Sequence, residues 1–87
     1  MTIRIEFYGV PRHHAGTAAI DVEAANLGAA LEAAACRLPL LRDSCLDHGR
    51  LKSGFLANIN SRKFVTDPTT PLSPGDCVLI LSADVGG

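Results

Sequence analysis

The segment CVLILS, at residues 77–82, most constrains how this chain folds. Val78 and Ile80 would lie on one face of an extended strand, and Leu79 and Leu81 on the other, so both faces are apolar. A strand of this kind belongs in the middle of a sheet rather than at its edge. The remaining strands of the chain must therefore flank this segment.

Four other segments have strand patterns. Residues 2–8 (TIRIEFY) alternate apolar and polar side chains, and residues 17–22 (TAAIDV) repeat this alternation after a turn that contains Gly, Pro and His. The short separation predicts an antiparallel hairpin, in which Gly16 supplies a positive φ. Residues 54–60 (GFLANIN) predict a third strand, and residues 62–65 (RKFV) a short fourth one.

One main helix is predicted between the hairpin and the third strand. Asn26 stands at the N-cap position, the apolar residues of 27–38 recur at helical spacing, and Pro39 ends the helix. Gly28 weakens the helix but lets it pack close to the sheet. Residues 40–49 predict a short second helix closed by Gly49. Three prolines make residues 66–76 a region of turns.

This order of elements predicts an α+β fold of the β-grasp type, a mixed sheet of four to five strands curled around one main helix. The last strand would lie beside the first and parallel to it, which requires a crossover connection. We expect one domain at residues 1–82, followed by an extended arm at 83–87. With 87 residues, of which 12 are alanine, the domain is small and its core thin.

Composition excludes several function classes. A net charge of −1 without a basic cluster gives nucleic-acid binding little support. The N-terminus has no signal-like apolar run, and no segment approaches the roughly 20 apolar residues of a membrane span, so we expect a soluble cytoplasmic protein. The 3 cysteines, Cys36, Cys45 and Cys77, have neither zinc nor redox spacing and are too few for an iron–sulfur cluster, so we expect free thiols and no metal.

The sequence ends in SADVGG, six residues that could reach about 20 Å beyond Leu81. A glycine pair at a chain end is usually without function, because termini fray. Here, however, two residues without Cβ would follow a central strand, and they can thread a narrow cleft. The carboxylate of Gly87 is ionised in the cell and is a poor electrophile, so chemistry there needs activation by ATP in a separate enzyme. The domain itself shows no catalytic motif, which indicates a carrier or a subunit rather than an enzyme.

Four segments resemble the MoaD/ThiS family of ubiquitin-like sulfur carriers, and the MoaD branch most. These are FYGVPRHHAG with Phe7, Arg12 and Gly16 in register, NINSRKF, PLSPGDCVLI with Leu72, Gly75, Asp76 and Val78 in register, and the final Gly86-Gly87. Three features depart from the MoaD pattern: His13 follows Arg12 in place of Glu, Cys77 replaces an acidic residue, and LSADV precedes the glycines.

The resemblance implies that a ubiquitin-activating-like enzyme adenylates Gly87, which then becomes a thiocarboxylate. In the MoaD branch, the tail enters the large subunit of molybdopterin synthase and gives its sulfur to a pterin precursor of the molybdenum cofactor. Gly86 and Val85 would lie in that channel, and no cofactor would be bound to the carrier itself. Related carriers serve thiamine thiazole, thio-metabolite or tRNA sulfuration pathways, and some modify proteins.

A partner surface is predicted less sharply than the tail. Arg12 is either a salt-bridge residue for the partner or a solvated loop residue. Phe55 or Leu56, together with Leu79 and Leu81, would form an exposed apolar patch. Alternatively, one of these faces is the core beneath the helix, and the sequence does not decide which.

Overall fold

A computed structural model describes residues 2–83 of the chain. Its elements, in chain order, are β1 (Thr2–Phe7), α1 (Gly9–Ala15), β2 (Ala19–Glu23), α2 (Leu27–Arg37), α3 (Pro39–Cys45), β3 (Leu46–Asp47), β4 (Arg50–Leu51), β5 (Phe55–Ile59), β6 (Lys63–Val65) and β7 (Cys77–Ser82). The predicted arm, except for Ala83, lies outside the described residues.

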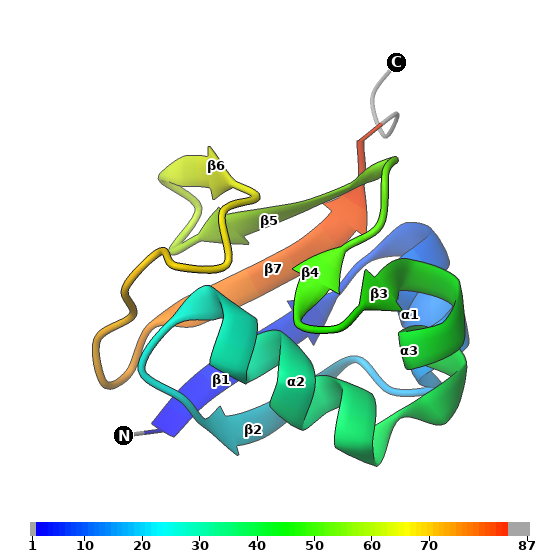
Figure 1. The fold of residues 1–87 in the computed structure, drawn as a ribbon, viewed down its shortest axis with the longest axis horizontal. Helices are drawn as coiled ribbons and strands as arrows, with labels where there is room; N and C mark the ends of the chain where they lie inside the picture. Colours follow the sequence, from blue (N-terminus) through cyan, green and yellow to red (C-terminus); the bar gives the residue numbers. More distant parts are fainter. Residues whose placement is uncertain (1, 84–87) are drawn as a thin grey trace.

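The strands form a five-stranded mixed sheet in the order β2-β1-β7-β5-β6 (Figure 1). Strand β7 is central, as its sequence predicts: it runs parallel to β1 on one side and antiparallel to β5 on the other. Strand β2 pairs antiparallel with β1, which confirms the predicted hairpin pairing. The α+β fold of the β-grasp type is therefore confirmed.

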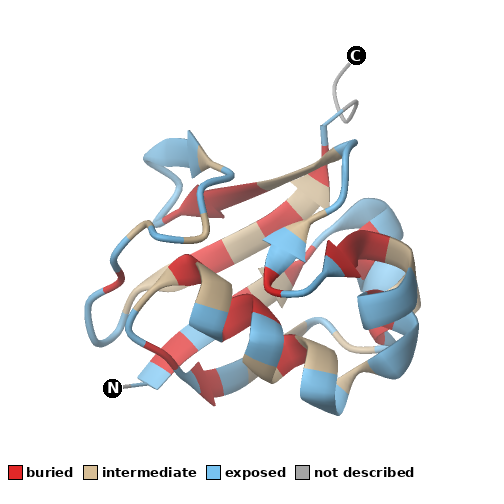
Figure 2. Cartoon of the chain, in the orientation of Figure 1, coloured by how far each residue is buried: buried red, intermediate tan, exposed pale blue. Residues whose placement is uncertain are grey.

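Helices α2 and α3 cover one face of the sheet, and α1 lies where β1 and β7 end (Figure 1). The core fills the space between these layers, and residues coloured as buried recur along α2, β1 and β7 (Figure 2). Its largest fully buried side chains are Phe7, Ile3, Ile5, Leu27, Leu31, Leu41, Ile80, Val78, Pro11 and Cys45. None of the helices within residues 2–83 is long and apolar enough to cross a membrane.

Helix α2 begins and ends as predicted. The side chain of Asn26 accepts a hydrogen bond from the backbone N–H of Ala29 (2.8 Å), which satisfies one of the unpaired donors of the first turn. The helix ends at Arg37, before Pro39 starts α3. Gly28 does allow a close approach, but to a loop rather than to the sheet: a Cβ there would lie 3.1 Å from Pro68.

The predicted turn at residues 9–16 is wrong in one respect, because most of it is helix α1. Pro11 is tolerated there since it lies in the first turn, whose N–H groups have no acceptor within the helix. Pro11 and Ala15 are four residues apart and both are buried, so one face of this short helix packs on the core. Gly16 ends the helix with φ 72°, and its N–H donates to the carbonyl of Arg12 (3.0 Å).

The predicted second helix is also too long. Helix α3 ends at Cys45, and the chain then forms the hairpin of β3 and β4. His48 and Gly49 make its two-residue turn with φ of 50° and 77°, because a tight hairpin turn of this kind needs positive φ at both positions. Gly49 therefore closes a hairpin rather than a helix.

Candidate functional site

The end of β7 is held firmly before the chain leaves the described region. The N–H of Tyr8 donates to the carbonyl of Ile80 (3.0 Å), and the N–H of Ala83 donates to the carbonyl of Gly54 (2.7 Å). Ser82 is 7% exposed, and it pairs in register with Phe55 of β5. The root of the predicted arm is thus fixed on both sides of the strand.

A shallow groove of about 520 Å³ lies beside this root. It is lined by Val10, Ser53, Gly54, Phe55, Ser82 and Ala83. Val10, at the start of α1, is 49% exposed, so the groove has an apolar wall open to solvent. The groove therefore offers apolar surface beside Ala83, the last residue that the structure describes.

Val85, Gly86 and Gly87 lie outside the described residues, so their predicted roles stay predictions. Covalent geometry still limits where they can act. Four residues span at most about 14 Å at 3.3–3.6 Å each. Any enzyme that acts on the carboxyl of Gly87 must therefore place its active site within about that distance of Ala83.

Burial along β7 shows which face of this strand is the core, and the strand register shows which residues of β5 share each face. Val78 and Ile80 lie beneath the helices and are buried, whereas Leu79 and Leu81 lie on the opposite face and are partly exposed. Leu56 of β5 is opposite Leu81 and therefore shares this second face, but Phe55 is opposite Ser82 and packs against the core. Of the two residues predicted for the apolar patch, Phe55 and Leu56, it is Leu56 that lies beside Leu79 and Leu81.

Phe64 completes this apolar surface, which we call the open-face patch: Leu56, Phe64, Leu79 and Leu81. Phe64 lies on the edge strand β6, pairs in register with Asn58, and is 61% exposed. The sequence pattern of residues 62–65 is too short to show on which face Phe64 lies. Apolar patches left exposed on a small domain often mark contact surfaces.

A polar row on β1 borders the open-face patch. The carboxylate of Glu6 accepts hydrogen bonds from Arg4 Nε (2.9 Å) and from the hydroxyl of Tyr8 (2.7 Å). Both hydrogen bonds lower the pKa of Glu6, and the bond from Arg4 has the larger effect. The hydrogen bond to Glu6 raises the pKa of Tyr8. The same face thus has a charged half on β1 and an apolar half on β5, β6 and β7.

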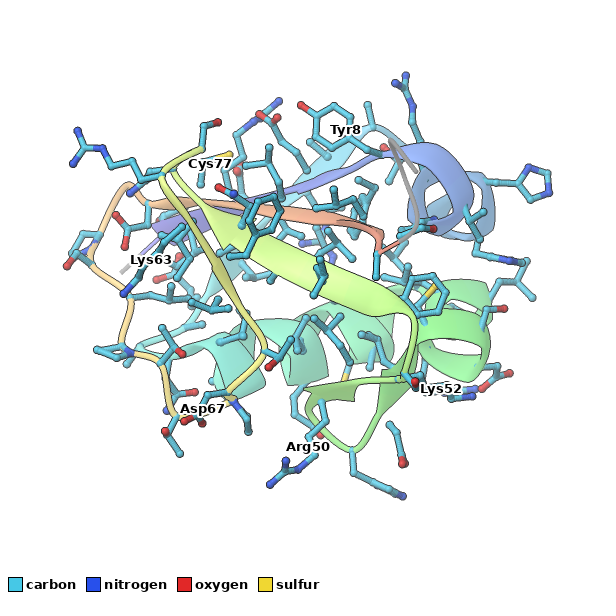
Figure 3. All side chains as sticks on the ribbon, turned by 90° about the horizontal axis from the view of Figure 1, so that it is seen from above. Tyr8, Arg50, Lys52, Lys63, Asp67 and Cys77 are labelled. Atoms are coloured by element: carbon cyan, nitrogen blue, oxygen red, sulfur yellow. The ribbon has the colours of Figure 1, made fainter. Side chains whose placement is uncertain are left out.

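Cys77 lies on this face too, opposite Arg4 in the register. Figure 3 shows Tyr8 and Cys77 on one side of the sheet, with Arg50, Lys52 and Asp67 on the other. Burial raises the pKa of the Cys77 thiol, and the nearby Glu6 carboxylate raises it further. The thiol is therefore protonated at neutral pH and is a weak nucleophile, which favours a packing role over an acyl-transfer role.

Arg12 lies on α1 and is exposed, and its charge acts on Tyr8, which is part of the polar row that borders the open-face patch. All three cysteines are free. Within residues 2–83, no three His, Cys, Asp or Glu side chains gather closely enough to hold a metal ion. His14 instead lies 3.3 Å from the hydroxyl of Ser44 on α3, which joins α1 to α3.

No family model and no curated protein matches the sequence. Solved structures do match by fold. Small archaeal modifier protein 1 (SAMP1) of Haloferax volcanii superposes with a TM-score of 0.82 over 100% of both chains, at 20% identity. CysO of Mycobacterium tuberculosis gives 0.77 at 20% identity over 93% of this chain and 98% of that one.

A third match is the Amycolatopsis orientalis BexX/CysO complex, with a TM-score of 0.79 and 17% identity over 98% and 99% of the two chains. At these identities the likeness concerns the fold, not the function. The architecture of the sheet and the structural matches agree: the chain has the ubiquitin-like β-grasp fold, which it shares with SAMP1 and CysO.

Proposed function

We propose that this chain is a sulfur carrier whose C-terminal Gly87 is adenylated and then converted to a thiocarboxylate. The observation that carries the proposal is the position of β7. This central strand ends at Ser82, its last hydrogen bond fixes Ala83, and the glycine pair follows within about 14 Å. The resemblance of four sequence segments to the MoaD/ThiS carriers supports the same conclusion.

The chemistry needs a partner enzyme, because a carboxylate is a poor electrophile. The Gly87 carboxylate attacks the α-phosphate of ATP, pyrophosphate leaves, and the glycyl-adenylate forms. A sulfur nucleophile then attacks the activated carbonyl carbon and displaces AMP. The residues described here contribute the anchored arm root and a docking surface, while the adenylating enzyme contributes catalysis.

For the sulfur acceptor, we propose the large subunit of molybdopterin synthase as the first partner to test. The resemblance to the MoaD branch supports it. Gly86 and Val85 would then lie in the acceptor channel, with Gly86 giving the clearance that a residue without Cβ allows. Carriers for thiamine thiazole, thio-metabolites or tRNA sulfuration remain the alternatives.

A second candidate function is protein modification, in which an amine of a lysine rather than a sulfur donor attacks the glycyl-adenylate. The observation that favours it is the likeness in fold to two structures of SAMP1, which is named a modifier. It predicts isopeptides between Gly87 and lysines in cellular digests. Their absence from cells grown under oxidative and sulfur-limiting conditions would count against this function.

The sulfur-carrier proposal is tested by intact-mass analysis of the full chain. The protein is incubated with the ubiquitin-activator-like adenylating enzyme of the same organism, ATP and a sulfur source. We expect the mass increase of one oxygen-to-sulfur exchange, mapped to Gly87, and none in a matched variant that lacks Gly86 and Gly87. A wild-type chain that stays unmodified with an active enzyme would refute the proposal. Addition of the large synthase subunit then tests whether dithiolene formation is restored.

A further inference from the structure

Asn58 is a polar residue in the middle of the open-face patch. It lies on β5 between Leu79 of β7 and Phe64 of β6, which are its partners in the strand register. The residue is only 8% exposed. Its Oδ1 is buried and has no hydrogen-bond partner among residues 2–83.

Asn60, two residues further along, shows what a satisfied asparagine looks like in the same sheet. Its Oδ1 accepts a hydrogen bond from the N–H of Cys77 (2.8 Å), and its Nδ2 donates to Asp76 (2.9 Å). Asn60 therefore has a structural role that accounts for its side chain. Asn58 has no such role, although a leucine or valine in its place would match the neighbouring apolar residues.

A buried acceptor without a partner destabilises the free domain, so such a group calls for an explanation. We propose that Oδ1 of Asn58 accepts a hydrogen bond from an N–H donor of the adenylating enzyme, which docks on the open-face patch. This inference rests on the proposed sulfur-carrier function and adds to it the residue that selects the partner.

The length of the arm limits which proteins can occupy the patch while they act on Gly87. The enzyme must place its active site within about 14 Å of Ala83 to reach Gly87. Leu79 lies four residues before Ala83 on β7, which is a distance of about 13 Å along the strand. Asn58 of β5 pairs with Leu79 and therefore lies at the same level of the sheet. A typical protein interface covers about 800 Å² on each partner, so one footprint includes both the arm root and Asn58. The adenylating enzyme meets this condition, and it is the partner that every alternative of the proposed function requires, so we assign the patch to it.

Phe64 is the exposed residue of the patch that pairs with Asn58 in the strand register. It flanks Asn58 from a three-residue edge strand and is largely exposed, so its ring can change rotamer when a partner packs against it. In the proposed complex, the partner displaces this ring and brings its donor to Oδ1 in an otherwise apolar contact. A partner surface without a donor leaves Oδ1 unpaired in the complex, and this discriminates against apolar surfaces that fit only by shape.

The test uses the full chain and carrier-dependent ATP–pyrophosphate exchange by the ubiquitin-activator-like adenylating enzyme of the same organism. For Asn58→Leu, we expect a KM for the carrier raised about tenfold or more, with kcat unchanged, because the enzyme's donor loses its acceptor. The urea midpoint of the free Asn58→Leu chain should be equal to or higher than that of wild type, since the unpaired acceptor is gone.

Two further variants separate recognition from folding. Asn58→Asp keeps an oxygen acceptor, and its KM should stay within about threefold of wild type even if the free chain is less stable. Asn60→Ala is the matched control: it removes two structural hydrogen bonds and should lower the urea midpoint with no change in KM.

Each outcome has a clear meaning. An unchanged KM for Asn58→Leu, with normal exchange by wild type, would overturn this inference and leave the sulfur-carrier function standing. A wild-type chain that supports no exchange would overturn the proposed function and this inference with it. Sedimentation that shows a wild-type dimer, lost in Asn58→Leu, would assign the patch to a second copy and also overturn the inference.

Discussion

Truncating Ile80 should destabilise the domain far more than truncating its neighbour Leu79. Consecutive side chains of a strand point to opposite faces, so the two residues test the two faces of β7 with the same backbone. Ile80 is 1% exposed beneath the helices, whereas Leu79 is partly exposed on the open face. An alanine at position 80 leaves an enclosed cavity, and an alanine at position 79 does not.

The expected magnitudes follow from this difference. Ile80→Ala loses both the transfer free energy and the cavity term, about 2–5 kcal/mol in total. Leu79→Ala loses only part of the transfer term, about 1 kcal/mol. A domain of 87 residues has a total stability of roughly 4–13 kcal/mol, so Ile80→Ala removes a large share of it. Ile80→Val, at about 0.5–1.5 kcal/mol, gives a milder variant that stays folded.

Urea unfolding followed by far-UV circular dichroism measures these free energies. The chain has no Trp and its only Tyr, Tyr8, is 43% exposed, so fluorescence would report the core poorly. We expect the three chains to have equal m-values. Their urea midpoints should fall from wild type to Leu79→Ala and fall further to Ile80→Ala. If Leu79→Ala were the more destabilised variant, Leu79 would lie in the core, and the assignment of the open face would be refuted.

Three further predictions concern single side chains. Asn26→Ala should lower the free energy of unfolding by about 1 kcal/mol in urea titrations, because the first turn of α2 loses its cap; an unchanged midpoint would contradict this. The carboxylate of Asp76 accepts hydrogen bonds that lower its pKa, and the largest effect comes from the N–H of Ser73. Its stabilising contribution is therefore present above the unfolded pKa of about 3.9 and is lost as the pH falls through the folded pKa, so Asp76→Asn should flatten the acid-side loss of stability. In native protein, iodoacetamide should label the exposed Cys36 well before Cys45, whose thiol is buried and has a raised pKa; equal rates by peptide mass analysis would show that the core opens readily.

The sequence predicts the strands well because their side chains alternate with a period of two. Residues 2–8 and 54–60 carry this pattern clearly, and the doubly apolar segment 77–82 correctly predicts a central strand. Helix α2 is equally predictable, since Asn26 and Pro39 mark its ends. In each case neighbouring residues in the sequence show a local physical requirement, such as a helix cap or a strand that must be covered on both faces.

The missed elements are those too short to show a period. Helix α1 has seven residues, among them Gly9, Pro11 and two histidines, and only its contacts with the core reveal a buried face. Strands β3 and β4 have two residues each, so their hairpin depends on the positive φ of His48 and Gly49. Such elements are stabilised by tertiary packing rather than by local propensity.

The candidate site divides in the same way. The glycine pair is visible in the sequence, but the face that carries the patch is not, because β7 is apolar on both sides. Burial decides it: Val78 and Ile80 are buried, whereas Leu79, which pairs with Glu6 and Asn58, is partly exposed. The unpaired oxygen of Asn58 has no sequence signal at all, since an asparagine in a strand looks the same whether or not its amide is satisfied.

Docking and delivery of Gly87 are mechanically linked in this fold, because the same two strands serve both. Strands β5 and β7 carry most of the open-face patch, and the loop before β5 holds Ala83 through the carbonyl of Gly54. A partner seated on the patch therefore fixes the position of the arm root as well. Substitutions in the patch should then change how tightly the carrier binds, and thus KM, while an intact root keeps the path of Gly87 to the active site, and thus kcat, unchanged.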